Sequence, residues 1–233
     1  LDQVVVHVTF LGGGFGRKSQ ADFIHEAVAL SKDVGAPIKV VWSREEDIKH
    51  DFLHAWSLQR MDAVTNPKGN VTGFRHRSVF PTLGTVFAPI TKIPEYLGAF
   101  DLETDMGISN MPYKFPNLTQ EANRIDSDVR IGWFRAVCNN FHAFGIQSML
   151  DHLATYTKKD PIDFQLAHIK KSAASKPAFD EYNHKRLIGV IEAVRKESGW
   201  DKKDKRHFGF SCHYSFLSYI ACVAEVEKND SEQ

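Results

Sequence analysis

Residues 11–19 read Leu11-Gly12-Gly13-Gly14-Phe15-Gly16-Arg17-Lys18-Ser19, and this glycine-rich loop decides how the N-terminal part of the chain folds. The β-branched run at residues 4–10 before it predicts a strand. Ser19-Gln20-Ala21-Asp22 after it has the form of a capping box, which predicts that a helix begins there. Glycines let backbone N–H groups approach a ligand closely, and a helix start adds free N–H donors. The loop is therefore predicted to bind an anionic ligand, with Arg17 and Lys18 adding positive charge.

Two nucleotide-binding motifs come close to this loop, and both fail at the same residue. The dinucleotide fingerprint needs glycine at its first, third and sixth positions, and the sixth position counted from Gly12 is Arg17. The P-loop needs a glycine directly before Lys-Ser, and that position is again Arg17. A P-loop-like phosphate site remains an alternative, as does a tight turn without a ligand.

The composition is typical of a globular domain and gives no sign of a nucleic-acid-binding protein or of a cysteine metal site. The chain has 233 residues, 29 Lys+Arg and 29 Asp+Glu, so it has no net charge that would indicate binding to nucleic acid. Hydrophobic residues make up 42% and charged residues 25%, which is typical of a globular domain. The three cysteines, Cys138, Cys212 and Cys222, form no Cys-x-x-Cys pair, so we expect buried free thiols and no metal-ligating residues.

Patterning predicts an α+β fold with mixed sheets and packed helices, in two domains. In the first, residues 1–110, the strand, loop and helix lead to a second strand at residues 38–42, which gives a βαβ unit. A hairpin follows at residues 58–64 and 71–79 around the turn Asn66-Pro67-Lys68-Gly69-Asn70.

The second domain, residues 111–233, is predicted to be rich in helices and to end in strands. An extended segment at 111–117 and a strand at 128–131 lead to helices from about 139, from Asp160-Pro161 and over 180–198. Two strands, 208–213 and 216–227, close the chain. We expect the chain to be a fragment of a longer polypeptide.

Several motifs together resemble the molybdenum hydroxylases, the superfamily of xanthine dehydrogenase and aldehyde oxidase. Gly12 to Lys18, followed by a Phe-x-x-Glu-Ala helix, is similar to the first cofactor segment of that family. Tyr113-Lys114-Phe115-Pro116-Asn117 and the later Gly132-Trp133-Phe134-Arg135 resemble the second, and the latter looks most like isoquinoline oxidoreductase beta subunits. Phe216-Leu217-Ser218-Tyr219 is similar to the same subgroup.

The resemblance implies a molybdopterin cofactor, here as the cytosine dinucleotide, in which the pterin and not the protein ligates molybdenum. It implies that Gly14, Phe15, Gly16 and Arg135 contact the cofactor beside the metal, and that Gly13 permits close approach to the pterin. Such backbone donors near an anionic centre agree with the prediction from the loop itself.

The family reaction is hydroxylation of a carbon in an N-heterocycle or an aldehyde, with water as the oxygen source. The resemblance implies that electrons leave through [2Fe–2S] clusters on a small partner subunit. The glutamate that acts as the base in this family lies in a C-terminal Gly-x-Gly-Glu segment, and these 233 residues do not include that segment. We therefore expect no catalytic residue here and no activity of the chain alone. A P-loop-like NTPase domain and a non-catalytic scaffold segment are the competing hypotheses.

Three positions depart from the family pattern. Ser19 stands where xanthine dehydrogenases carry a substrate-binding glutamate, which argues against a purine substrate. Arg17 replaces the commoner glycine, and Gln147 stands where the isoquinoline-type branch leads us to expect glutamate.

Overall fold

The computed structural model describes residues 5–83, 103–173, 183–202 and 207–227. The chain divides into two compact units, one formed by Leu1–Ala55 with Ser127–Val137 and the other by Trp56–Asp126 with Cys138–Gln233. The first residues of the helix expected at 180–198 lie outside the described residues. In the part of the chain that is described, no helix is long and apolar enough to span a bilayer.

The smaller unit has short helices and extended chain. A 3-10 turn, η1 (Arg17–Ser19), precedes helix α1 (Asp22–Val34), and helix α2 (Arg44–His50) begins at Ser43, whose hydroxyl accepts the Glu46 N–H. Helix α1 ends at Gly35, which has a φ of 67° and donates its N–H to the Ser31 carbonyl. A glycine in the left-handed conformation is a common way for a helix to end.

Two predictions for this unit are wrong. Residues 5–10 and 38–42 have no strand assignment, because an extended chain becomes a strand only when another strand accepts its hydrogen bonds, and no described segment does so. The capping box does not form: Ala21 occupies the N-cap without a side-chain bond, and the Ser19 hydroxyl instead donates to the Gly16 carbonyl.

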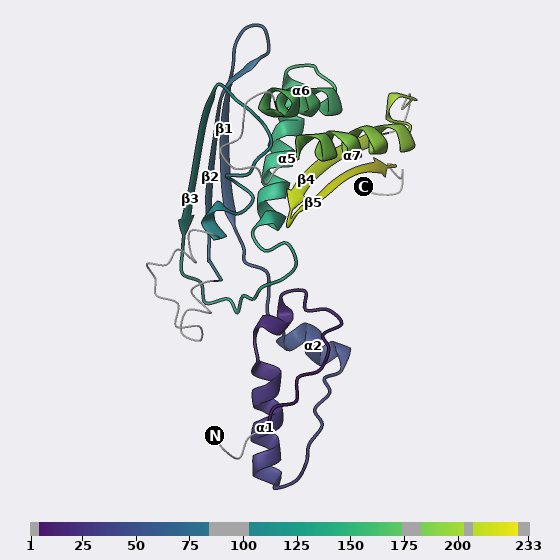
Figure 1. Cartoon of the computed structure of the whole chain (residues 1–233). Helices are drawn as coiled ribbons and strands as arrows, with labels where there is room; N and C mark the ends of the chain where they lie inside the picture. Colours follow the sequence, from purple (N-terminus) through teal and green to yellow (C-terminus); the bar gives the residue numbers. More distant parts are fainter. Residues whose placement is uncertain (1–4, 84–102, 174–182, 203–206, 228–233) are drawn as a thin grey trace. The chain divides into compact units, whose positions relative to one another are not determined.

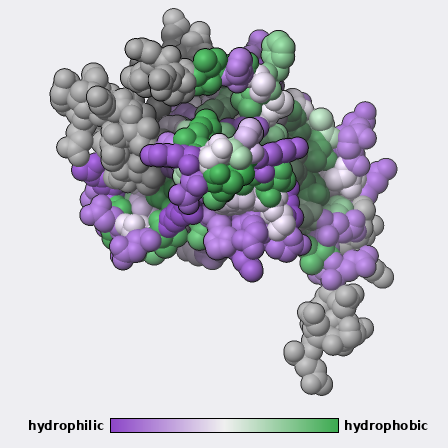
Figure 2. Space-filling view, turned by 90° about the horizontal axis from the view of Figure 1, so that it is seen from below, coloured by the Kyte–Doolittle hydropathy of each residue, from purple (hydrophilic) through white to green (hydrophobic). Residues whose placement is uncertain are grey.

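Apolar side chains of this unit reach the surface. Helix α1 contains no buried residue, and Phe23, Ile24, Val28 and Val34 are each between 45% and 63% exposed. Figure 2 shows green apolar side chains on one face of the molecule, bordered by purple hydrophilic ones. Exposed apolar residues in such numbers are typical of a segment that packs against further protein.

The larger unit contains a three-stranded sheet and a hairpin with helices packed on them (Figure 1). Strand β2 (Val71–Phe80) is central, with β1 (Leu58–Thr65) antiparallel on one side and β3 (Asn117–Arg124) parallel on the other. The β1–β2 hairpin confirms the sequence prediction. In its turn the Asn66 side chain accepts the N–H groups of Lys68 and Asn70, and Gly69 takes a φ of 69°.

Helices and a second hairpin pack together in the rest of the described part of this unit. Helix α5 (Asn139–Tyr156) contacts β1 and β4, α6 (Pro161–Ala173) packs on α5, and α7 (His184–Glu197) covers the hairpin of β4 (His207–Ser215) and β5 (Ser218–Val226). The helix predicted from about residue 139 is confirmed as α5, and its apolar side chains Ile146, Leu150 and Leu153 are each at most 4% exposed. The mixed α+β class is therefore confirmed.

Candidate functional site

Two turns carry the motifs found in the sequence: the first turn is the glycine loop at residues 12–18, and the second turn is residues 132–135. Both lie in the smaller compact unit, and they contact one another. A Cβ placed on Gly16 would lie 1.8 Å from the Trp133 carbonyl oxygen, so only glycine permits this approach. The Arg135 guanidinium carbon lies 5.4 Å from the centre of the Phe15 ring, within the range of a cation–π contact. Residues more than a hundred positions apart in the sequence therefore form one local site.

Both turns have unusual backbone conformations. Phe15 and Gly16 have φ values of 50° and 83°, and Ala136 and Val137 have 71° and 48°. A side chain in this left-handed region costs about 1 kcal/mol or more, so such residues persist only where surrounding structure holds them. Phe15 in the first turn, and Ala136 and Val137 directly after Arg135, are therefore strained, a pattern that is common at ligand sites.

The turns also present hydrogen-bond donors. Within the described part of the chain, the N–H groups of residues 13–16 and of Arg135 donate to no acceptor. Arg135 and Lys18 form no ion pair with a described carboxylate, whereas Arg17 contacts Asp22 and Asp51. Unpaired amide donors beside unpaired cations make an arrangement suited to an anionic group.

The expected site residues thus fall into one place. Gly13, Gly14, Phe15 and Gly16 line the first turn, and Arg135 comes from the second. A Cβ on Gly14 would meet Leu11 at an ordinary 3.6 Å, and one on Gly12 would meet nothing within 4 Å. The first turn therefore does not need these two glycines for its own packing. Among the described residues no three His, Cys, Asp or Glu side chains gather as a metal site.

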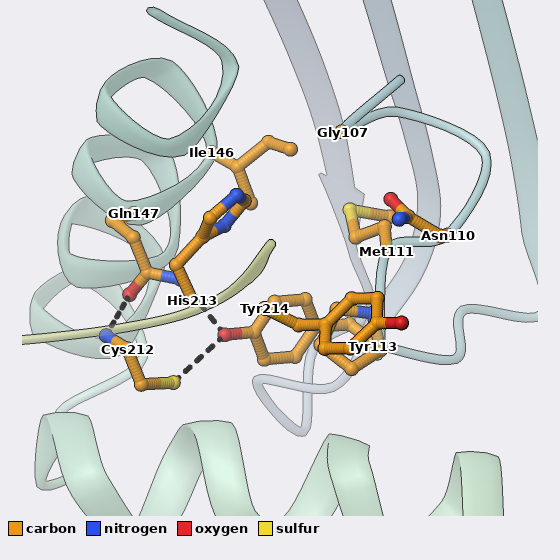
Figure 3. Close-up of a pocket in the computed structure, with 10 residues that line it drawn as sticks. Gly107, Asn110, Met111, Tyr113, Ile146, Gln147, Cys212, His213 and Tyr214 are labelled. Carbon is orange, nitrogen blue, oxygen red and sulfur yellow. Dashed lines mark hydrogen bonds between the residues drawn. The ribbon is translucent and has the colours of Figure 1, made fainter. Parts of the chain in front are cut away.

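The larger unit contains a buried ring of polar side chains that was not predicted from the sequence. Figure 3 shows three residues of this cluster, Tyr113, Gln147 and Cys212. The Tyr113 hydroxyl donates to Gln165 at 2.7 Å, the Gln165 amide donates to Gln147 at 3.0 Å, and the Gln147 amide donates back to Tyr113 at 2.8 Å. Cys212 joins the ring, because its N–H donates to the Gln147 oxygen. The cavity beside this ring has a volume of about 10 Å³, room for a single water molecule and far too little for a pterin.

The hydrogen bonds of this ring explain why residue 147 is a glutamine, and burial in the same region keeps the Cys212 thiol protonated. Gln147 must donate and accept at once, which a glutamate carboxylate cannot do, so glutamine is the residue that fits. Burial raises the pKa of the Cys212 and Cys138 thiols to about 12, so both remain protonated. The expectation of buried free thiols holds for these two but is wrong for Cys222, which is exposed on β5.

Two buried histidines of the same unit, His76 and His142, are linked by hydrogen bonds through other polar side chains. The His142 Nδ1–H donates to the Met106 carbonyl, which leaves Nε2 to accept the Ser78 hydroxyl at 2.8 Å. Ser78 accepts the Gln59 amide, and the Gln59 oxygen accepts His76 Nε2–H. The His142 imidazole is consequently neutral, and the buried Nδ1 of His76 has no hydrogen-bond partner among the described residues. Burial lowers the pKa of His76 to about 4 and that of His142 to about 3.

Comparison with known proteins identifies the family. Residues 1–168 match the molybdopterin cofactor-binding domain, and this match covers more than half of the chain. The chain belongs to the family of molybdopterin cofactor-binding domains. The resemblance inferred from the glycine loop and from the second turn is thereby confirmed.

Curated relatives and solved structures agree with this family. The chain is 27% identical to the beta subunit of isoquinoline 1-oxidoreductase from Brevundimonas diminuta, over 99% of this chain and 28% of that protein. It is 27% identical to a nicotinate dehydrogenase subunit from Pseudomonas putida, over 81% of this chain and 15% of that one. The aldehyde oxidoreductase of Desulfovibrio gigas shares the fold with a TM-score of 0.62 at 16% identity, over 87% of this chain and 22% of that one. This molybdopterin cofactor-binding domain therefore spans less than a third of the length of these relatives.

Proposed function

We propose that this domain belongs to the large subunit of a molybdopterin-dependent oxidoreductase, and that the cofactor binds where the two turns of the smaller unit meet. The observation that carries this proposal is the contact of Phe15 and Gly16 with the turn that holds Arg135. At this contact the N–H groups of residues 13–16 and of Arg135 donate to no acceptor among the described residues. The family match and the names of the relatives, which are oxidoreductases and dehydrogenases, support it.

The residues of the chain fit an anionic, phosphate-bearing cofactor. Gly13 and Gly14 lack side chains that would block its approach, and the N–H groups of residues 14–16 would donate to its oxygen atoms. Arg135, held over Phe15, would bring a positive charge from the second turn. When bound, molybdopterin supplies a redox-active metal centre that oxidises a substrate carbon with an oxygen atom from water.

The finer assignments are part of the same proposal. The cofactor is the cytosine dinucleotide form, electrons pass to [2Fe–2S] clusters on a small partner subunit, and the substrate is an N-heterocycle or an aldehyde. The similarity to subunits of isoquinoline 1-oxidoreductase and nicotinate dehydrogenase favours a heterocycle. We also propose the division at residue 110 as the boundary between two cofactor-binding subdomains.

A phosphate-binding NTPase gains no support. Its motif needs a glycine before Lys-Ser, and the residue there is Arg17, whose side chain is engaged by Asp22 and Asp51.

Two matched glycine variants test the proposal in the full-length protein copurified with its small subunit. Gly12→Ala and Gly14→Ala each add one methyl group that the fold accommodates. Only Gly14 is proposed to face the cofactor, so molybdenum and oxidised-pterin content should fall in Gly14→Ala and remain at the parental level in Gly12→Ala. Absence of molybdenum from the parental protein, together with tight ATP binding, would overturn the proposal.

A further inference from the structure

Two arginines contact the ring of one phenylalanine in the same compact unit as the proposed cofactor site. The guanidinium carbon of Arg17 lies 5.1 Å from the centre of the Phe52 ring, and that of Arg130 lies 4.2 Å from it. Arg17 comes from the glycine loop, Arg130 from the segment before the second turn, and Phe52 from the chain after α2. The three side chains therefore join segments that are far apart in the sequence.

Two carboxylates bind these arginines. Asp22 accepts Arg17 Nη1 and Nη2 at 2.8 and 3.1 Å, and it also accepts Arg130 Nη2 at 3.3 Å. Asp51 pairs with Arg17 Nε at 2.5 Å. The Asp22 carboxylate thus links both arginines, and all three guanidinium nitrogens of Arg17 are paired with carboxylates of the protein.

These pairs are not ordinary surface pairs. The side chains of Arg17, Asp22 and Asp51 are only 22%, 25% and 17% exposed. Burial opposes ionisation of Asp22, but the hydrogen bonds and charge of Arg17 outweigh it, so the pKa of Asp22 is lowered. The Asp22 carboxylate therefore remains charged at neutral pH.

Backbone contacts continue the cluster to the second turn. The Leu53 N–H donates to the Arg130 carbonyl at 2.9 Å, and the Gly132 N–H donates to the Leu53 carbonyl at 3.0 Å. A Cβ on Gly132 would lie 2.5 Å from Phe52 Cβ, so the Phe52 side chain is seated directly against this turn. The next residue is Trp133, whose carbonyl meets Gly16.

We propose that Arg17 and Asp22 are positioning residues that hold the glycine loop against the second turn, and that Arg17 is not a ligand of the anionic cofactor. This inference rests on the proposed function for the identity of the cofactor, but the clamp itself is a property of the protein. We name Arg17, Asp22, Asp51, Phe52 and Arg130 the arginine clamp. This proposal differs from the expectation that the positive charge of Arg17 serves the ligand.

The two roles of Arg17 predict opposite effects of Asp22→Asn. If Arg17 binds the cofactor, removing a neighbouring negative charge strengthens the attraction of an anion, and cofactor content stays equal or rises. If the clamp positions the loop, releasing both arginines loosens the two turns, and cofactor content falls. Asp33→Asn is the matched control, because it removes the same charge from an exposed position of α1.

Hydrogen exchange measures the clamp without the cofactor. The amides of Ser19, Leu53 and Gly132 donate hydrogen bonds that depend on the clamped arrangement. In the full-length protein freed of cofactor, we expect Asp22→Asn to speed their exchange about tenfold, the factor that corresponds to about 1.4 kcal/mol at 25 °C. Amides of residues 146–153 in α5 report that the larger unit remains folded, and Asp33→Asn leaves all rates unchanged.

The outcomes separate this inference from the proposed function. Unchanged exchange at Gly132 and Leu53 in Asp22→Asn would overturn the clamp, whatever the molybdenum content. Faster exchange together with no molybdenum in any variant, the parent included, would support the clamp and defeat the cofactor assignment. Arg17→Lys serves as the second variant if Asp22→Asn fails to fold: it keeps the charge but cannot bridge both carboxylates, so faster exchange is again expected, and parental exchange would contradict the clamp.

Discussion

Acidification from pH 7 to pH 5 should destabilise the larger unit through its buried histidines. His76 and His142 are neutral in the folded protein, with pKa values of about 4 and 3, whereas the ordinary histidine pKa is 6.5. Below pH 6.5 the unfolded chain takes up a proton at each histidine and the folded chain does not. Each histidine whose pKa is lowered in the folded state therefore reduces the free energy of unfolding as the pH falls below 6.5. The reduction continues until the pH reaches the folded-state pKa.

The size of the effect follows from these pKa values. Each histidine lowers the free energy of unfolding by about 1.4 kcal/mol for every pH unit between 6.5 and its folded-state pKa. At pH 5 this is about 2 kcal/mol for each, or on the order of 4 kcal/mol for His76 and His142 together. Other titrating groups add to the total, so a comparison of variants isolates the contribution of one histidine.

Urea unfolding followed by circular dichroism at pH 7 and pH 5 tests this prediction. His76→Gln keeps an N–H donor toward Gln59 but cannot titrate, so the loss between the two pH values should shrink by about 2 kcal/mol. The exposed His25→Gln is the control and should lose as much stability as the parent. An equal loss in His76→Gln and in the parent would refute the reasoning.

Three further substitutions test other parts of the molecule. Gly16→Ala forces a methyl group into the facing turn at a φ of 83°, so exchange of the Gly132 amide should accelerate and molybdenum content should fall; parental values for both would contradict the contact between the turns. Gln147→Glu places a carboxylate in the buried ring, so the free energy of unfolding at pH 7 should fall by about 3 kcal/mol, and by less at pH 5 where the carboxyl can donate. Asp160→Ala removes the cap of α6 and the acceptor of the Trp200 indole N–H, so urea unfolding should show a loss of about 2 kcal/mol; a loss within about 0.5 kcal/mol, the range of an ordinary surface substitution, would show that the cap is dispensable.

Elements with strong local signals were predictable from the sequence. The β1–β2 hairpin follows from its turn, because Asn66 and Gly69 each supply a conformation or hydrogen bond that the turn needs. Helix α6 begins where Asp160-Pro161 indicates, with the Asp160 carboxylate accepting two N–H groups. These interactions lie within five residues in the sequence, so the pattern records them directly.

Elements that depend on distant partners were not predictable. Strand β3 is polar and largely exposed, and only its pairing with β2 makes it a strand. Residues 128–131 were predicted as a strand, but they contribute only a single bridge, between Leu53 and Ile131. The capping box fails for a similar reason, since Asp22 is bound by Arg17 and Arg130.

The residues of the candidate site were predictable from the sequence, but the contacts of the arginine clamp that hold the two turns together were not. The glycine loop and the turn before Arg135 both carry recognisable motifs, and the structure brings Phe15 and Arg135 together. The arginine clamp has no local signature, because its members come from four separate segments. The charge of Arg17 predicted a role in ligand binding, whereas its ion pairs with Asp22 and Asp51 are the basis of our proposal that it positions the glycine loop.

The position of the metal tests the central claim most directly. Anomalous diffraction at the molybdenum edge, from crystals of the full-length protein with its small subunit, locates the metal without assumptions about the cofactor. We predict a molybdenum peak beside the backbone of residues 14–16 and Arg135. A peak far from both turns, or no molybdenum peak in active protein, would contradict the proposed cofactor site.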